Sequence, residues 1–189
     1  AQKAYMESLE QVAKEAEGLL EDLFEFSRIE SGNETIEMVH VGDFLRQLIA
    51  RFYVSADVNL VIEDDWPTLE IQANFLRKIF RNLIDNALKF NNSSQKIVEI
   101  AWRSAENQSY EFFVRDNGIG IQSRYFDQIF GVFQRLHTLE EYEGNGIGLA
   151  IVKKVVNKLG GSVRLMSKPG EGSTFFVTLP RTQRQERIQ

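Results

Sequence analysis

The first thirty residues carry apolar side chains at helical spacing, with no proline and one internal glycine, Gly18. Such spacing predicts a single amphipathic helix, which Ser31-Gly32-Asn33 would end. Because one helix with a broad apolar stripe is not stable alone, we expect partner helices and, along part of the stripe, a second subunit. The stripe consists of Met6, Leu9, Ala13, Ala16, Leu20 and Leu23, widened by Val12, Leu19 and Phe26.

Beyond this stop, segments of alternating apolar and polar residues lie between segments of helical periodicity, which predicts an α+β domain over residues 33–181. The most regular helix is predicted at 72–90, with Phe75, Leu76, Ile79, Phe80, Leu83, Ile84, Ala87 and Leu88 on its apolar face. Other predicted helices are 43–54, 122–130 and 147–159, and the predicted strands are 35–39, 58–63, 96–103, 109–115, 162–167 and 173–179. Residues 131–145 are polar and aperiodic, as in a mobile loop, and residues 182–189 are expected to be a frayed tail. We expect a sheet with helices on one face and the helical arm in front.

Composition narrows the classes of function. A chain of 189 residues with 43% hydrophobic residues can bury one real core, and its net charge of −5 disfavours a nucleic-acid partner. The absence of cysteine excludes disulfides and thiolate metal sites and favours a reducing, cytoplasmic compartment. No apolar run is long enough to span a bilayer, so we expect a membrane tether only if an anchor lies upstream of Ala1.

A polar stripe interrupts the predicted helix at 72–90. Asn82 and Asn86 are four residues apart and therefore lie on one face, with Lys89 adjacent. Amide oxygens are neutral hard ligands that suit Mg²⁺, and an ammonium group suits phosphate. By itself, this stripe is equally consistent with a solvated helix face.

Three glycine-containing clusters follow. Asp116-Asn117-Gly118-Ile119-Gly120 comes directly after a predicted strand, where a carboxylate can accept from an exocyclic amine, although the same residues also suit a plain turn. Gly144-Asn145-Gly146-Ile147-Gly148-Leu149-Ala150 opens a predicted helix, whose N-terminal N–H groups suit an anion. A dinucleotide fingerprint is disfavoured there because no strand precedes it. The third cluster, Gly170-Glu171-Gly172-Ser173-Thr174, reads alone as a hairpin turn.

The order and spacing of these four clusters are more specific than any one of them. They resemble the N, G1, G2 and G3 boxes of the histidine-kinase branch of the gyrase, chaperone, kinase and mismatch-repair (GHKL) ATPase superfamily. The segment 129–136 looks like the F box of these kinases, and 19–32 resembles the end of their second dimerisation helix. The resemblance implies a Bergerat-type α/β sandwich at 33–181, preceded at 1–32 by the second helix of a dimerisation and phosphotransfer domain.

The resemblance also implies a role for each matching residue. Asn86 would coordinate the Mg²⁺ of Mg-ATP, with Asn82 nearby, and Lys89 and Arg135 would contact phosphate. Asp116 would accept from the adenine amine, with Gly118 and Gly120 allowing close approach. The remaining nucleotide contacts would come from Phe90, Gly144, Gly146, Gly148, Leu149 and Thr174, and Phe130 and Phe133 would pin a lid over residues 131–145.

Departures from the family pattern matter as much as the matches. The two histidines, His40 and His137, are not followed by the acidic residue of a phosphoacceptor box, so we expect the acceptor helix to lie N-terminal to Ala1. In the gyrase-type ATPases a glutamate that activates water occupies the position of Asn82, and an amide cannot act as a base. Asp85 is expected to point off another side of the helix.

The implied protein is the catalytic part of a sensor histidine kinase, which transfers the γ-phosphate of ATP to a histidine for relay to the receiver domain of a response regulator. The alternative is a degenerate kinase that regulates a partner through its helical arm. A gyrase-like ATPase is disfavoured by Asn82 and by the arm. The segment 133–142 also looks like those of kinases with PAS or phytochrome-type sensors.

Overall fold

The computed structural model describes residues 2–31, 35–52, 57–136, 142 and 145–182. Helices and strands alternate in a layout that confirms the α+β prediction. In chain order the elements are α1 (Gln2–Ser31), β1 (Glu37–His40), α2 (Val41–Phe52), β2 (Val58–Ile62), β3 (Thr68–Ile71), α3 (Ala73–Lys89), β4 (Lys96–Ala105), β5 (Ser109–Asp116), the 3-10 helix η1 (Ser123–Tyr125), α4 (Gly148–Lys158), β6 (Ser162–Lys168) and β7 (Gly172–Pro180).

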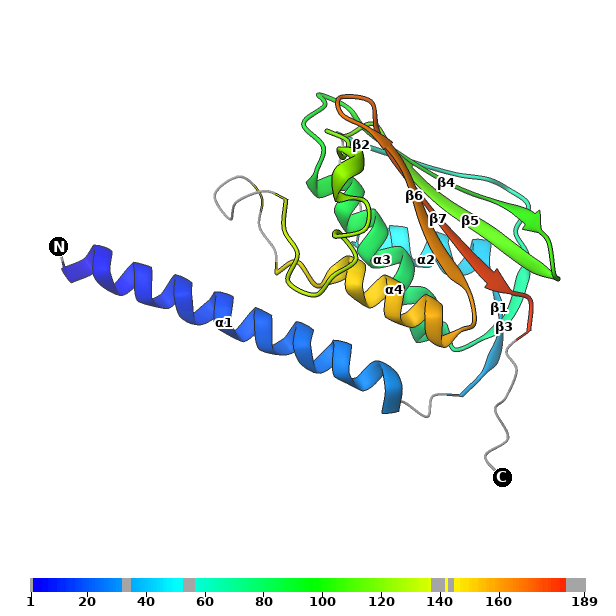
Figure 1. Ribbon diagram of the computed structural model, residues 1–189, viewed down its shortest axis with the longest axis horizontal. Helices are drawn as coiled ribbons and strands as arrows, with labels where there is room; N and C mark the ends of the chain where they lie inside the picture. The colour runs from blue at the N-terminus through cyan, green and yellow to red at the C-terminus, as the bar shows by residue number, and fades with distance from the viewer. Residues whose placement is uncertain (1, 32–34, 53–56, 137–141, 143–144, 183–189) are drawn as a thin grey trace.

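The main sheet has five strands in the order β2-β4-β5-β7-β6. The pair β2 and β4 is parallel and every other pair is antiparallel, so the sheet is mixed but largely antiparallel, as expected. Helices α3 and α4 cover one face of this sheet, and α1 lies beside α4 with its N-terminal turns projecting beyond it (Figure 1). A sheet covered in this way buries every second residue of its strands.

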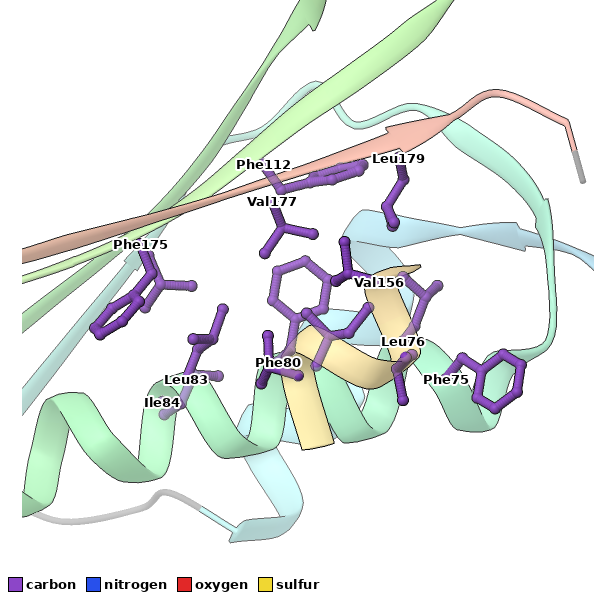
Figure 2. Close-up of a cluster of buried hydrophobic side chains, with 14 of the residues drawn as sticks. Phe75, Leu76, Phe80, Leu83, Ile84, Phe112, Val156, Phe175, Val177 and Leu179 are labelled. Atoms are coloured by element: carbon purple, nitrogen blue, oxygen red, sulfur yellow. The ribbon is translucent and has the colours of Figure 1, made fainter. Parts of the chain in front are cut away.

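The core lies between the sheet and α3. Seven of the eight apolar residues predicted on this helix are buried, and Leu88 is half-buried. The labelled side chains of β5 and β7 point toward those of α3 and α4, with Phe112 above Phe80 (Figure 2). These two rings meet edge to face at 5.9 Å between centroids. Alternation along β7 buries Phe175, Val177 and Leu179 on the same side.

Two predictions about elements are wrong. Strand β3 was not predicted, although it pairs with β1 in a separate two-stranded sheet; it lies directly before the start of α3, with only Gln72 between them. The helix predicted at 122–130 is the 3-10 turn η1 followed by turns, held by hydrogen bonds such as the one from the Gln128 N–H to the Tyr125 carbonyl at 3.0 Å.

Helix α1 presents most of its apolar stripe to solvent. Leu20 is 55% exposed and Phe24 is 65% exposed, whereas Ile29, at the end of the helix, is buried. In the part of the chain that the structure describes, no helix is both long and apolar enough to cross a bilayer.

Candidate functional site

A cavity of about 290 Å³ opens between α3, the end of β5 and the start of α4. Its size is near the lower end of the range for small-molecule sites. The cavity brings together residues from all four clusters that the sequence singled out. They include Asn82, Asn86, Lys89, Phe90, Asp116, Gly120, Arg135, Gly146, Gly148 and Leu149.

One end of the cavity is built around the carboxylate of Asp116, which is 8% exposed at the end of β5. Its Oδ1 accepts hydrogen bonds from the N–H groups of Gly118, at 2.8 Å, and Ser173, at 3.2 Å. Burial raises the pKa of Asp116 to about 6, against the opposing effect of these two donors. A buried carboxylate held in this way suits a ligand that donates a hydrogen bond.

Two glycines allow the strands to close around Asp116. A Cβ at Gly120, where φ is +69°, would lie 2.0 Å from the Lys168 carbonyl oxygen. A Cβ at Gly172, where φ is +90°, would lie 2.0 Å from the Asp116 carbonyl oxygen. Both the left-handed backbone and the close approach therefore require glycine at these positions. Gly118 does not line the cavity and instead supports it through its N–H.

The other end of the cavity is formed by the start of α4. The helix begins at Gly148, just after Gly146 with its φ of +70°, and Asn82 lies beneath it on α3. A Cβ at Gly148 would be 2.6 Å from Asn82 Oδ1, while Asn82 Nδ2 donates to the Lys78 carbonyl at 2.7 Å. The start of an eleven-residue helix offers unpaired N–H groups and a favourable dipole for an anion.

Aromatic and basic side chains form the rim. Phe90 packs against Tyr142 with 5.0 Å between ring centroids, and Lys89 Nζ lies 4.5 Å from the Phe90 ring centroid. Arg135 donates to the Tyr142 carbonyl at 2.9 Å, and the Tyr142 hydroxyl bonds with Asn92 Oδ1 at 3.0 Å. These contacts place two cationic groups beside the cavity.

The structure departs from three expectations about individual residues. Thr174 does not line the cavity, because the alternation of β7 turns its side chain to the other face and brings Ser173 in instead. Phe133 is 51% exposed and also lies outside the cavity, so of the two phenylalanines expected to pin the lid only Phe130 is packed, against Phe175. Asp85 lines the cavity instead of pointing off another side, with its carboxylate 3.6 Å from Arg81 Nε.

The structure also describes the surroundings of His40. His40 lies at the end of β1, as expected, and outside the cavity, but Asp43 supplies a carboxylate 3.1 Å from its Nδ1. The acidic neighbour that the sequence order lacks is therefore present in space. Gly144 and His137 lie outside the described residues.

Sequence reasoning missed several residues that line the cavity, namely Asp22, Tyr142, Asn145 and Ser173. Ser173 could have been found from the period-two pattern of its strand, since it shares a face with Phe175. Asp22 had no local signal, because only the packing of α1 brings it to the cavity.

Comparison with known proteins places this site in a family. Residues 71–183 match the model of the histidine kinase-, DNA gyrase B- and HSP90-like ATPases. Cyanobacterial phytochrome A from Nostoc is 35% identical over 164 residues, which cover 86% of this chain and 21% of that protein. The autoinducer 2 sensor kinase/phosphatase LuxQ from Vibrio harveyi is 36% identical over 88% of this chain and 21% of its own length. The chain thus spans about a fifth of these relatives.

Solved structures show the same fold. Full-length ShkA, in complex with AMPPNP, has a TM-score of 0.74 at 23% identity, covering 97% of this chain and 39% of that one. The mycobacterial sensor histidine kinase MprB has a TM-score of 0.67 at 24% identity. The match covers 79% of this chain and 100% of the MprB chain. The chain belongs to the histidine kinase-, DNA gyrase B- and HSP90-like ATPase family, on its sensor histidine kinase branch.

Proposed function

We propose that this chain binds Mg-ATP and serves as the catalytic part of a sensor histidine kinase, transferring the γ-phosphate to a histidine outside the chain for relay to a response-regulator receiver domain. The observation that carries this proposal is the position of Asp116. Its buried carboxylate lies at one end of a 290 Å³ cavity whose other end is the start of α4. The two ends suit a base with an exocyclic amine and a chain of phosphates.

The base end favours adenine for a chemical reason. Asp116 Oδ1 already accepts two backbone N–H groups, and we assign Oδ2 to the exocyclic amine of the ligand. Guanine carries a carbonyl oxygen at the corresponding position, which a carboxylate would repel. We assign the hydroxyl of Ser173 to the same end in place of Thr174, because Ser173 lines the cavity.

The phosphate end supplies positive charge and N–H donors. We assign Lys89, Arg135 and the N–H groups at Gly146 and Gly148 to the phosphates, with Leu149 completing the wall. These groups would neutralise and orient the phosphates, which is most of what a phosphoryl transferase must do.

The amide oxygen of Asn86 is the proposed Mg²⁺ ligand, and the carboxylate of Asp85 lies one residue away in the same wall. Such oxygens fit a hard cation. Among the described residues, however, no group of three acidic or histidine side chains is placed to hold a metal by itself. The shell would therefore be completed by phosphate oxygens and water, and the bound ion would neutralise charge on the phosphates.

The walls of the cavity favour phosphoryl transfer over hydrolysis. Asn82 occupies the place of a general base and cannot take a proton. Asp85 is near, but its carboxylate is paired with Arg81 on the helix surface. We infer that water in the site is poorly activated, so that the γ-phosphate is transferred to an acceptor imidazole rather than to water.

We also propose that the chain acts in a homodimer through residues 1–32, taken as the second helix of a dimerisation domain. Supporting this, Leu19, Leu20, Leu23 and Phe24 are exposed on α1. An apolar stripe of this kind suits the same helix of a second copy.

Incubation with γ-labelled ATP tests the transfer step. The 189-residue chain should bind ATP without acquiring an acid-labile, base-stable label. A longer chain, extended upstream through a helix with a His-Glu or His-Asp box, should be labelled. Label on His40, where Asp43 offers a carboxylate, would overturn the assignment of the acceptor to another segment. An extended chain that binds ATP but stays unlabelled would favour the regulatory alternative.

A further inference from the structure

Helix α1 contacts the rest of the molecule through a narrow face in its C-terminal half. Gly18, Asp22, Phe26 and Ile29 recur at helical spacing on this face, and all four are half-buried or buried. Lys154 Nζ lies 4.2 Å from the Phe26 ring centroid, and Lys158 Nζ donates to the Glu30 carbonyl at 3.0 Å. The face shares Phe26 with the predicted stripe but is distinct from the exposed apolar residues Leu19, Leu20, Leu23 and Phe24.

At the start of this face, α1 meets Asn145. Asn145 Nδ2 donates to Asp22 Oδ2 at 2.8 Å. One turn earlier, a Cβ at Gly18 would lie 3.3 Å from the same nitrogen, closer than ordinary contact. Glycine within a helix costs about 1 kcal/mol relative to alanine, so this close approach gives Gly18 a structural reason. Gly18 and Asp22 thus form a notch in α1 that holds Asn145.

The notch also brings a negative charge to the cavity. Asp22 lines the cavity and is bonded to Asn145, three residues before the first residue of α4. Its carboxylate therefore lies at the end where the start of α4 suits an anion. A carboxylate and a phosphate at the same end repel each other, and both compete for the local N–H donors.

We propose that Asp22 opposes nucleotide binding while Asn145 sits in the notch, so that the docked α1 is the low-affinity state and a bound nucleotide releases it. The inference rests on the proposed function, because it concerns the phosphates of the same ligand. Coupling between two equilibria is reciprocal, so a ligand that is repelled by the docked helix must itself favour undocking.

Two substitutions separate the effect of the Asp22 charge from the effect of the contact between α1 and Asn145. Asp22→Asn removes the charge but keeps an oxygen that can accept from Asn145, and Gly18→Leu fills the notch. We expect ATP affinity to rise about threefold for Asp22→Asn, and this increase should be smaller at high salt. For Gly18→Leu we expect ATP affinity to rise about three- to tenfold. The matched controls are Glu21→Gln, which removes an exposed charge next to Asp22, and Ala16→Leu, which places the same leucine side chain at an exposed position of the helix. Neither control should change the affinity.

A distance measurement tests docking without relying on affinity. The chain has no cysteine, so Ala13→Cys on α1 and Glu106→Cys after β4 would carry the only two spin labels. Labelled chains diluted with unlabelled ones report distances within one chain. We expect the distance to increase with Gly18→Leu and, in the parent chain, with ATP, whereas Asp22→Asn without ATP should leave it unchanged.

The outcomes distinguish this inference from the proposed function. A parent chain that binds no ATP would contradict the proposed function, while the effect of Gly18→Leu on the nucleotide-free distance would still test the notch. If the parent chain binds ATP but Asp22→Asn and Gly18→Leu bind it equally or more weakly, the opposing role of Asp22 is wrong. If Gly18→Leu leaves the distance unchanged, the notch is wrong.

Discussion

The two ends of the cavity are built in different ways. At the Asp116 end, neighbouring strands of one sheet meet, and backbone N–H groups of Gly118 and Ser173 fix the carboxylate. At the α4 end, the wall combines side chains from α1, from α3 and from the segment before α4, joined by side-chain contacts such as that of Asn145 with Asp22.

The Asp116 end is therefore fixed by the sheet, whereas the geometry of the α4 end changes with the position of α1. The Asp116 end depends on the register of β5 with β7, which is held by the hydrogen bonds between the two strands and by the core beneath them. The α4 end depends on where α1 lies. We therefore expect substitutions at the Asp116 end to act on stability and base recognition, and substitutions at the α4 end to act on metal and phosphate binding.

The largest effect is expected where the strands close around Asp116. Gly172→Ala places a Cβ 2.0 Å from the Asp116 carbonyl oxygen at a φ of +90°, so it should lower the free energy of unfolding by more than about 3 kcal/mol. Gly170→Ala is the matched control, since φ there is +79° but nothing lies within 4 Å of the added Cβ, and it should cost only about 1 kcal/mol. Urea unfolding measures both, and equal losses would show that the close approach is unimportant.

Removal of the carboxylate comes next. Asp116→Ala should weaken ATP binding by about one to two decades, since a hydrogen bond to a charged group contributes roughly 1.5–3 kcal/mol. Asp116→Asn keeps an oxygen for the Gly118 and Ser173 N–H groups but turns a donor toward the ligand amine, so it should bind as weakly as the alanine variant. Calorimetric titration gives both affinities, and parent-like binding by either variant would remove Asp116 from the site.

The pH dependence of stability tests the environment of Asp116 without a ligand. The pKa of Asp116 is raised to about 6 in the folded protein, so the folded state holds a proton that the unfolded state has already lost. The stability that this bound proton contributes to the folded state is fully present below about pH 4 and is lost as the pH rises through about 6. Asp116→Asn should therefore be more stable than the parent chain at pH 7.5, by roughly 3 kcal/mol, with the difference vanishing near pH 4. A difference independent of pH would contradict the raised pKa.

The smallest effect is expected when the proposed Mg²⁺ ligand Asn86 is removed. Asn86→Ala removes one hard oxygen ligand, so the ratio of ATP affinities with and without Mg²⁺ should fall severalfold, while the affinity without Mg²⁺ stays nearly the same. Asn59→Ala, at an exposed position of β2 outside the cavity lining, serves as the control. An unchanged ratio for Asn86→Ala would exclude this side chain as a metal ligand.

The same contrast explains what could be predicted from the sequence. The apolar periodicity of α3 and the order of the polar clusters were enough to predict the α+β layout and to single out Asp116 and Gly120, because these features are local in the chain. Ser173 takes the place of Thr174 because successive residues of β7 point to opposite faces of the sheet, so only one of the two can face the cavity. Asp22 and Tyr142 could not be predicted, since each reaches the cavity only through the packing of segments far apart in the chain.

The most direct test of the account is a calorimetric comparison of ATP with GTP on the parent chain, in the presence of Mg²⁺. The two ligands carry the same phosphates and differ at the base, where Asp116 is assigned to accept from an amine. We predict that ATP binds at least about tenfold more tightly than GTP, because a carbonyl in place of the amine would face the Asp116 carboxylate. Equal affinities would contradict the assignment of the fixed end of the cavity to adenine.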